Sequence, residues 1–175
     1  MRSIIRGAVV LLGTVGLALL GPAAMAEAST SSGVTSQDAA FLRAAHQSNL
    51  AEITTGKLAQ RKARSGEVRD LGRMWVEHHT MLDADLKKVA KRLGVTLPTR
   101  PNAEQRAQAA KDAKYSGAAF DRVWLSGELT GHVKTRTAGR TELAQGSNAD
   151  VKKVARTSAP VVQKHINEIV AAQKG

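Results

Sequence analysis

Apolar residues recur every three or four positions along four long stretches of the chain, which is the spacing of one helix face. These stretches cover about residues 36–64, 65–93, 117–145 and 148–173. The sequence shows no strand-like alternation of useful length and no internal repeat. The pattern therefore predicts an all-α protein, a bundle of four long helices.

Local sequence marks where these helices begin and end. Gly94 after a basic turn, with Pro98 beyond it, ends the second helix, and Pro160 predicts a kink or a break in the fourth. The long crossover before the third helix carries a short helix over about 103–114. The expected N-terminal caps are Thr35 with Asp38, Ser65, Asn102, and Ser147 with Asp150.

Each apolar stripe also contains ionisable side chains. They are Glu52 in the first, His79 in the second, Asp121, Glu128 and His132 in the third, and His165 in the fourth. An unpaired buried charge costs several kcal/mol, so such groups pair, lose their charge or bind a metal. Imidazoles and carboxylates that face a bundle core suit iron, manganese, zinc or copper. The stripes thus indicate a metal site, and the alternative is a structural network of hydrogen bonds and salt bridges.

The spacing of these groups differs from the standard di-iron arrangement. That arrangement uses Glu-x-x-His pairs, and the chain has none. Glu128 and His132 are instead four residues apart, and His165 precedes Glu168. This departure argues against a ferroxidase.

A second candidate lies within one helix, in the sequence MWVEHHTM. Met74, His78 and Met81 share a flank of that helix beside His79. Thioether and imidazole ligands together favour copper, especially Cu(I). The alternative is that the methionines only pack in the core.

Composition narrows the function classes. The chain has no cysteine, which excludes disulfides, thiolate chemistry, iron–sulfur clusters and covalent c-type haem. The net charge is +11, but aromatic residues make up 3% of the chain, too few for nucleic-acid stacking. We expect no nucleic-acid partner, and at most weak association with anionic envelope polymers or lipid headgroups.

The N-terminus has the features of a signal peptide. Arg2 and Arg6 precede an apolar run over 8–20, and Ala24-Met25-Ala26 forms a cleavage motif. The run is too short to span a membrane comfortably, which disfavours a permanent anchor. We therefore expect a signal peptide over 1–26 cleaved after Ala26, a flexible leader over 27–36, and a bundle domain over 37–175. The mature protein is expected to be extracytoplasmic, in the cell envelope or secreted, without a transmembrane segment.

Four segments carry a resemblance to a known family. They are FLRAAHQSNLAEITTGKLAQRKA, VRDLGRMWVEHHTMLDADLKKVAKRLGVTLP, SGAAFDRVWLSGELTGHVKT and APVVQKHIN. Together they resemble the bacterial domain-of-unknown-function family 4142, over roughly residues 38–172. The resemblance implies a ferritin-like fold and export, but no established activity. The positions that match the family's motifs are Glu52, His79, Asp121, His132 and His165.

One motif position departs from that family. His78 stands where the family usually has Asp, which replaces an anionic ligand by a neutral one. The His78–His79 pair with Met74 also resembles one helix of family 305, a copper-associated ferritin-like group. We therefore expect an exported bundle protein that is non-enzymatic or of unproven activity, an envelope accessory or stress-type protein whose polar core is a candidate site for a transition metal. The alternatives are an envelope interaction module with a structural polar core, and a metal-dependent oxidase.

Overall fold

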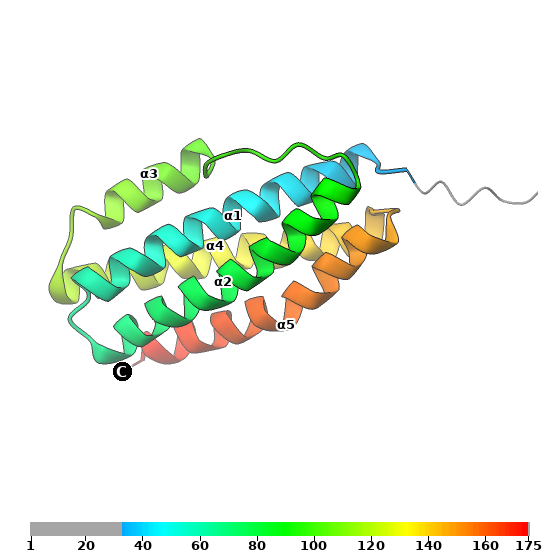
Figure 1. The fold of residues 1–175 in the computed structure, drawn as a ribbon. Coiled ribbons are helices and arrows are strands. Elements are labelled where there is room, and N and C mark those ends of the chain that lie inside the picture. The colour runs from blue at the N-terminus through cyan, green and yellow to red at the C-terminus, as the bar shows by residue number, and fades with distance from the viewer. Residues whose placement is uncertain (1–32, 175) are drawn as a thin grey trace, which may run out of the picture. The chain divides into compact units, whose positions relative to one another are not determined.

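The computed structural model describes residues 33–174 (Figure 1). Within them lie helices α1 (Ser36–Lys62), α2 (Gly66–Arg92), α3 (Ala103–Asp112), α4 (Gly117–Gln145) and α5 (Ala149–Ala172). The all-α prediction is confirmed, and α1 begins at the last residue assigned to the leader. The expected signal peptide and nearly all of the expected leader lie outside the described residues.

The four long helices pack side by side around a shared core. Short turns join α1 to α2 and α4 to α5, so each of these pairs is antiparallel (Figure 1). The α1 helix also packs against α4, and α2 against α5. The long connection from α2 to α4 carries α3, which lies against α1 and α4.

Two of the predicted caps are confirmed as capping boxes. Thr35 caps α1 reciprocally with Asp38, and Asn102 caps α3 in the same way. The Ser147 prediction is wrong, because the N-cap of α5 is Asn148. Ser65 is the N-cap of α2 but makes no side-chain cap hydrogen bond.

Asp38 explains why Ser147 does not cap α5. The Ser147 hydroxyl donates to the Asp38 carboxylate at 3.1 Å, and the backbone N–H groups of Ser147 and Asn148 donate to it at 3.0 and 3.1 Å. Burial alone would raise the pKa of Asp38, but hydrogen bonds from Thr35 and Asn148 lower it well below its usual range. One ionised carboxylate thus joins the starts of α1 and α5.

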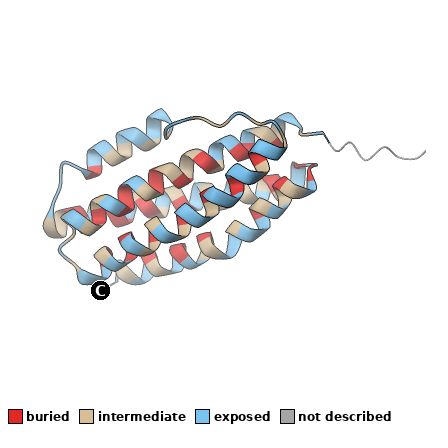
Figure 2. Cartoon of the chain, in the orientation of Figure 1, coloured by how far each residue is buried: buried red, intermediate tan, exposed pale blue. Residues whose placement is uncertain are grey.

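Buried residues line the inward faces of the four long helices (Figure 2). They form two apolar clusters with polar groups between them. Trp75 and Trp124 lie in the cluster near the α1–α2 turn, and their ring centroids are 5.7 Å apart. Leu42 and Leu86 belong to the cluster at the opposite ends of those helices. Buried polar residues occupy the intervening turns; they include Asn49, Glu52, His79, Glu128, His132 and His165.

The α1 and α2 helices approach closely where two glycines meet. A Cβ atom added to Gly56 would lie 2.7 Å from the carbonyl oxygen of Gly72, and one added to Gly72 would lie 2.7 Å from that of Gly56. The two helix backbones are therefore too close here for a side chain at either position. The crossing lies one turn beyond Glu52 and fixes how deeply α1 sits against α2.

The α5 helix continues through Pro160 without a break. Proline removes one backbone donor and disturbs the preceding turn. Pro160 is exposed, so water can reach the freed carbonyl group. Of the two predicted alternatives, the break is wrong and the kink stays a prediction.

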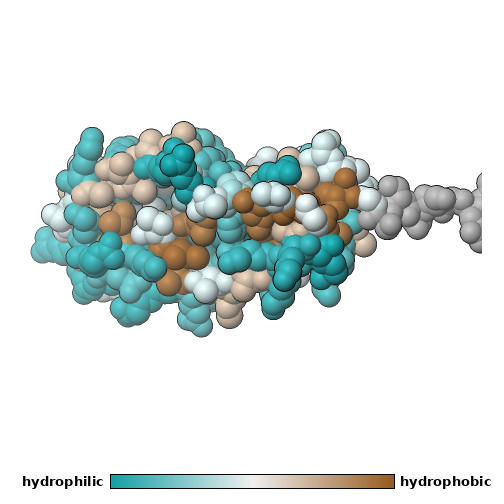
Figure 3. Space-filling view, turned by 45° about the horizontal axis from the view of Figure 1, so that its top comes forward, coloured by the Kyte–Doolittle hydropathy of each residue, from teal (hydrophilic) through white to brown (hydrophobic). Residues whose placement is uncertain are grey.

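The outer surface is mixed in character. Hydrophobic residues reach the surface in the middle of one face, between hydrophilic margins (Figure 3). Within residues 33–174, none of the helices has the length and apolar character needed to cross a membrane.

Candidate metal centre

His79 of α2 points into the core and is oriented by Asn49 of α1. Its Nδ1 lies 2.9 Å from Asn49 Oδ1, an oxygen that can only accept, so Nδ1 carries the proton. Nε2 therefore presents a lone pair. That atom is buried and has no hydrogen-bond partner among the described residues.

Three more histidines form a directed chain of hydrogen bonds. His132 Nδ1 donates to the backbone oxygen of Glu128 at 2.8 Å, which leaves His132 Nε2 as an acceptor. His165 Nδ1 lies 3.1 Å from that Nε2, and His78 Nδ1 lies 2.8 Å from His165 Nε2. In this arrangement each ring donates through Nδ1, and the chain runs from half-buried His78 into the core.

Three of these imidazoles converge on one point. His79, His132 and His165 each offer a nitrogen within 4.8 Å of the other two. A tetrahedral metal with metal–nitrogen bonds of about 2.0–2.1 Å requires nitrogens roughly 3.3 Å apart. The 3.1 Å between His132 Nε2 and His165 Nδ1 is close to that spacing. Trp75 stacks on the His165 ring, with centroids 4.2 Å apart, and restricts its rotation.

Two carboxylates lie beside the histidines. Glu52 of α1 and Glu128 of α4 form, with His132, a second group whose ligand atoms lie within 4.8 Å of one another. Trp75 Nε1 donates to Glu128 Oε2 at 3.0 Å, whereas Glu52 Oε2 is buried without a partner among the described residues. Burial raises the pKa of Glu52, and the neighbouring Glu128 carboxylate raises it further.

Burial keeps the three converging imidazoles neutral. It lowers the pKa of His79, and the other histidines lower it further. Burial also lowers the pKa of His132, against the opposing effect of Glu128, and it brings the pKa of His165 to about 3. Neutral imidazole is the form that binds metals, so protons do not compete for these lone pairs at ordinary pH.

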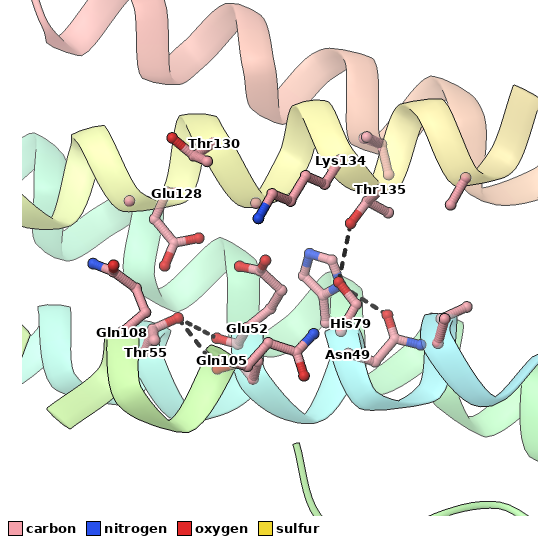
Figure 4. A pocket seen from close by; sticks show the side chains of 18 of the residues that line it. Asn49, Glu52, Thr55, His79, Gln105, Gln108, Glu128, Thr130, Lys134 and Thr135 are labelled. Atoms are coloured by element: carbon pink, nitrogen blue, oxygen red, sulfur yellow. Dashed lines mark hydrogen bonds between the residues drawn. The ribbon is translucent and has the colours of Figure 1, made fainter. Parts of the chain in front are cut away.

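A cavity of about 570 Å³ adjoins the cluster. It lies between α1 and α4, and α3 lines one side of it. Figure 4 shows the carboxylates of Glu52 and Glu128 facing one another there, with Gln105 and Gln108 of α3 beside them. The cluster therefore adjoins a space large enough for a small molecule.

The structure gathers five of the six predicted core ligands and places the sixth elsewhere. Glu52, His79, Glu128, His132 and His165 belong to the two ligand groups just described. Asp121 instead accepts the backbone N–H groups of Arg64 and Ser65 at 3.1 and 3.0 Å. It holds the α1–α2 turn against α4.

The predicted copper flank of α2 does not come together as one group. His78 faces His165, whereas Met81 is 56% exposed. Met74 Sδ lies 3.0 Å from Lys164 Nζ and packs against the apolar cluster.

Sequence reasoning missed the residues that support His79. Neither Asn49 nor Asp83 was predicted as a site residue, although Asn49 fixes the tautomer of His79. Asp83, one turn after His79, holds Asn49 Nδ2 at 3.5 Å and His46 Nδ1 at 2.6 Å. The i,i+4 spacing from His79 to Asp83 was the available indication, because both then share the inward face.

Comparison with known proteins gives a family and no activity. The chain matches the family described as Domain of unknown function (DUF4142) over residues 23–171, and it belongs to that family. Searches of curated proteins and of solved structures found no match.

Proposed function

We propose that this DUF4142 member is an exported protein with a ferritin-like four-helix bundle that binds a transition-metal ion in its core. His79 Nε2, His132 Nε2 and His165 Nδ1 are the donors. Glu52 and Glu128 lie on the other edge of the His132 ring, 3.9 and 3.7 Å from its Nδ1, so they compensate the charge of the ion or reach it only by side-chain rotation.

The observation that carries the proposal is the buried, unpartnered Nε2 of His79. Leaving a buried polar atom without a partner costs about 1–3 kcal/mol. Asn49 nevertheless holds the ring in the tautomer that directs this lone pair toward two other imidazoles. A metal ion would satisfy the atom.

Metal binding requires a change of tautomer in His165. Its Nδ1 now faces His132 Nε2 as a donor, and a ligand needs a lone pair there. If His165 Nε2 donates to His78 Nδ1, the reverse of the present direction, Nδ1 is freed without any ring leaving its place. His78 is then the outer partner that orients a ligating imidazole.

The donor set limits the metal. Neutral imidazoles suit zinc, copper and iron, and carboxylates extend the range to manganese. The two methionines of α2 add no thioether donor to the cluster, so its chemistry does not favour Cu(I) specifically.

The test is metal content by mass spectrometry, on protein purified without an affinity tag or chelator. We expect near-stoichiometric metal in the parent and roughly 10- to 100-fold weaker binding, or none, in His79→Ala. Glu142→Gln is the control, because it changes a buried ionisable residue outside the two ligand groups and outside the hydrogen bonds that support them, and it should retain the metal. A parent without metal, and without a higher melting temperature in any of the four ions, would contradict the proposal.

A structural polar network is the alternative. The His78–His165–His132 chain supports it, because those hydrogen bonds are satisfied without an ion. In that case His79→Ala would change stability while no ion bound either protein.

Export and the boundaries at 26 and 36 are part of the same proposal and rest on the sequence. N-terminal sequencing of protein recovered outside the cytoplasm should give Glu27 as the first residue. An intact Met1 in that fraction would contradict cleavage.

A further inference from the structure

We infer that the cavity between α1 and α4 is a binding site for a small organic amine, whose ammonium group pairs with the Glu52 and Glu128 carboxylates while its apolar body fills the cavity. This inference goes beyond the proposed metal site and does not depend on it.

The deep end of the cavity offers a buried carboxylate acceptor. Glu52 lines the cavity and is 6% exposed, and its Oε2 has no hydrogen-bond partner among the described residues. A ligand that satisfies this carboxylate oxygen must donate a hydrogen bond.

Charge selects a cation over a neutral donor. The raised pKa of Glu52 lets it share a proton with Glu128, and an ammonium group bound between the two carboxyl groups would replace that proton, because the imidazole nearest to both, His132, is neutral. The cationic residues around the cavity, Lys111, Arg122 and Lys134, are exposed, and Lys134 is already paired with Glu104. Exposed cations are screened by solvent and salt, whereas a buried carboxylate pair is not. An ammonium group would supply the missing countercharge and several donors at once.

The remaining walls determine the body of the ligand. Phe41, Leu82, Leu86 and Val162 line the cavity with apolar surface. A volume of about 570 Å³ is within the range of small-molecule sites. Gln105 and Gln108 of α3 lie along its side and can hydrogen-bond a polar substituent (Figure 4). An amine on a short alkyl or aryl body fits these walls.

The experiment compares hexylamine with 1-hexanol on the full-length protein, by calorimetry and tryptophan fluorescence. Trp75 Nε1 donates to Glu128 Oε2, so its emission should respond when an ammonium reaches that carboxylate. We expect saturable binding of hexylamine and at least about tenfold weaker binding of hexanol. Equal affinity for both probes, or no saturable amine binding below about 10 mM, would overturn the inference.

Two variants and a control locate the site. Glu52→Gln should weaken hexylamine about 10- to 100-fold and leave hexanol unchanged. Gly131→Val should weaken both probes, because its Cβ would lie at ordinary contact distance, 3.6 Å, from Glu52 Oε1 and its methyl groups would occupy the cavity. Glu104→Gln, a cavity-lining carboxylate that is exposed, is the matched control and should change neither. Parent-like amine binding by Glu52→Gln would refute the assignment.

A final arm separates this inference from the metal proposal. The titration is repeated after dialysis against a chelator, and hexylamine should still bind. Binding that disappears with the metal would mean that the amine ligates the ion, and the carboxylate site would then be wrong. Amine binding by protein that takes up no metal would support this inference while the metal proposal failed.

Discussion

The cluster is built from side chains whose hydrogen bonds decide which nitrogen of each imidazole is free. Asn49 gives His79 its tautomer, and the Glu128 carbonyl gives His132 its tautomer. Asn49 lies on α1 opposite His79 of α2, and Glu128 lies one turn before His132 in α4, so both lone pairs are directed before any ion arrives. Pre-organisation of this kind reduces the cost of binding.

Removing the Asn49 side chain tests this orientation. Asn49→Ala leaves His79 Nδ1 without its acceptor, so the ring loses the contact that fixes its tautomer and angle. We expect metal affinity to fall roughly 10- to 100-fold, as for other partners of metal-ligating histidines. Competition with a coloured chelator measures the change. Ser48→Ala is the control, because Ser48 bonds Thr135 and no histidine; an equal loss there would contradict a specific role for Asn49.

At the scale of the helix, the position of α1 against α2 depends on the glycine contact. Gly56 lies one turn beyond Glu52, so a change in this crossing would move a carboxylate of the cluster. The close approach therefore links helix packing to the geometry of the site.

Gly56→Ala should force α1 away from α2. Its Cβ would meet the Gly72 carbonyl oxygen at 2.7 Å, which backbone atoms can relieve only by shifting. We expect a loss of about 1–3 kcal/mol in the free energy of unfolding, measured by urea denaturation. Gly139→Ala in α4 is the control, because nothing lies within 4 Å of its added Cβ. It should stabilise the protein by about 0.5–1 kcal/mol, and destabilisation there would argue against this account.

Elements were more predictable from sequence than the relations between them. Helix spans and the Thr35 and Asn102 caps depend on residues three or four positions apart, so they can be predicted from local sequence alone. Asp121 shows what periodicity cannot predict. Its spacing places it on the same helix face as Glu128, but spacing does not tell which residues of other helices lie at the same level. Asp121 lies two turns closer to the start of α4 and contacts the α1–α2 turn instead.

The cavity, and the Asp38 carboxylate that joins the starts of α1 and α5, could not be predicted from the sequence either. Both depend on where the crossover lays α3 and on which helix starts meet, and these are relations between residues far apart in sequence. Periodicity selected five of the residues that converge, because all of them face inward. It could not supply the tautomers or the free lone pair that give the group its chemistry.

For the molecule as a whole, the buried histidines and the buried carboxyls have opposite effects on the free energy of unfolding as pH falls. Burial lowers the pKa of His79, His132 and His165, so acid favours the unfolded chain, which takes up their protons from about pH 6.5 downward. The pKa of Glu52 is raised, that of Glu142 to about 7 and that of Asp112 to about 6. These carboxyls take up protons first in the folded state. For Glu142 and Asp112 this favours folding as pH falls through about 7 and 6, so the two sets have opposite effects on stability there.

Below about pH 4.5 this opposition ends. The carboxyls are then increasingly protonated in both states, whereas the histidines that burial holds neutral are charged only in the unfolded chain; His165, with a pKa of about 3, is one of them. Each histidine that stays neutral costs about 1.4 kcal/mol of stability per pH unit. The low pKa of Asp38 adds to the loss as pH falls below 3.8. We therefore expect a stability plateau from about pH 6.5 to 4.5 and steep unfolding below it.

Urea titrations across pH, in chelator, measure this profile. His79→Asn should reduce the acid slope by about one proton, or about 1.4 kcal/mol per pH unit. Glu142→Gln should leave that slope unchanged and instead remove a contribution that stabilises the parent below pH 4.5 and is lost as pH rises through about 7. A parent that keeps its stability down to pH 3 would show that the histidines become charged without unfolding, and the neutral, metal-ready cluster would then be wrong.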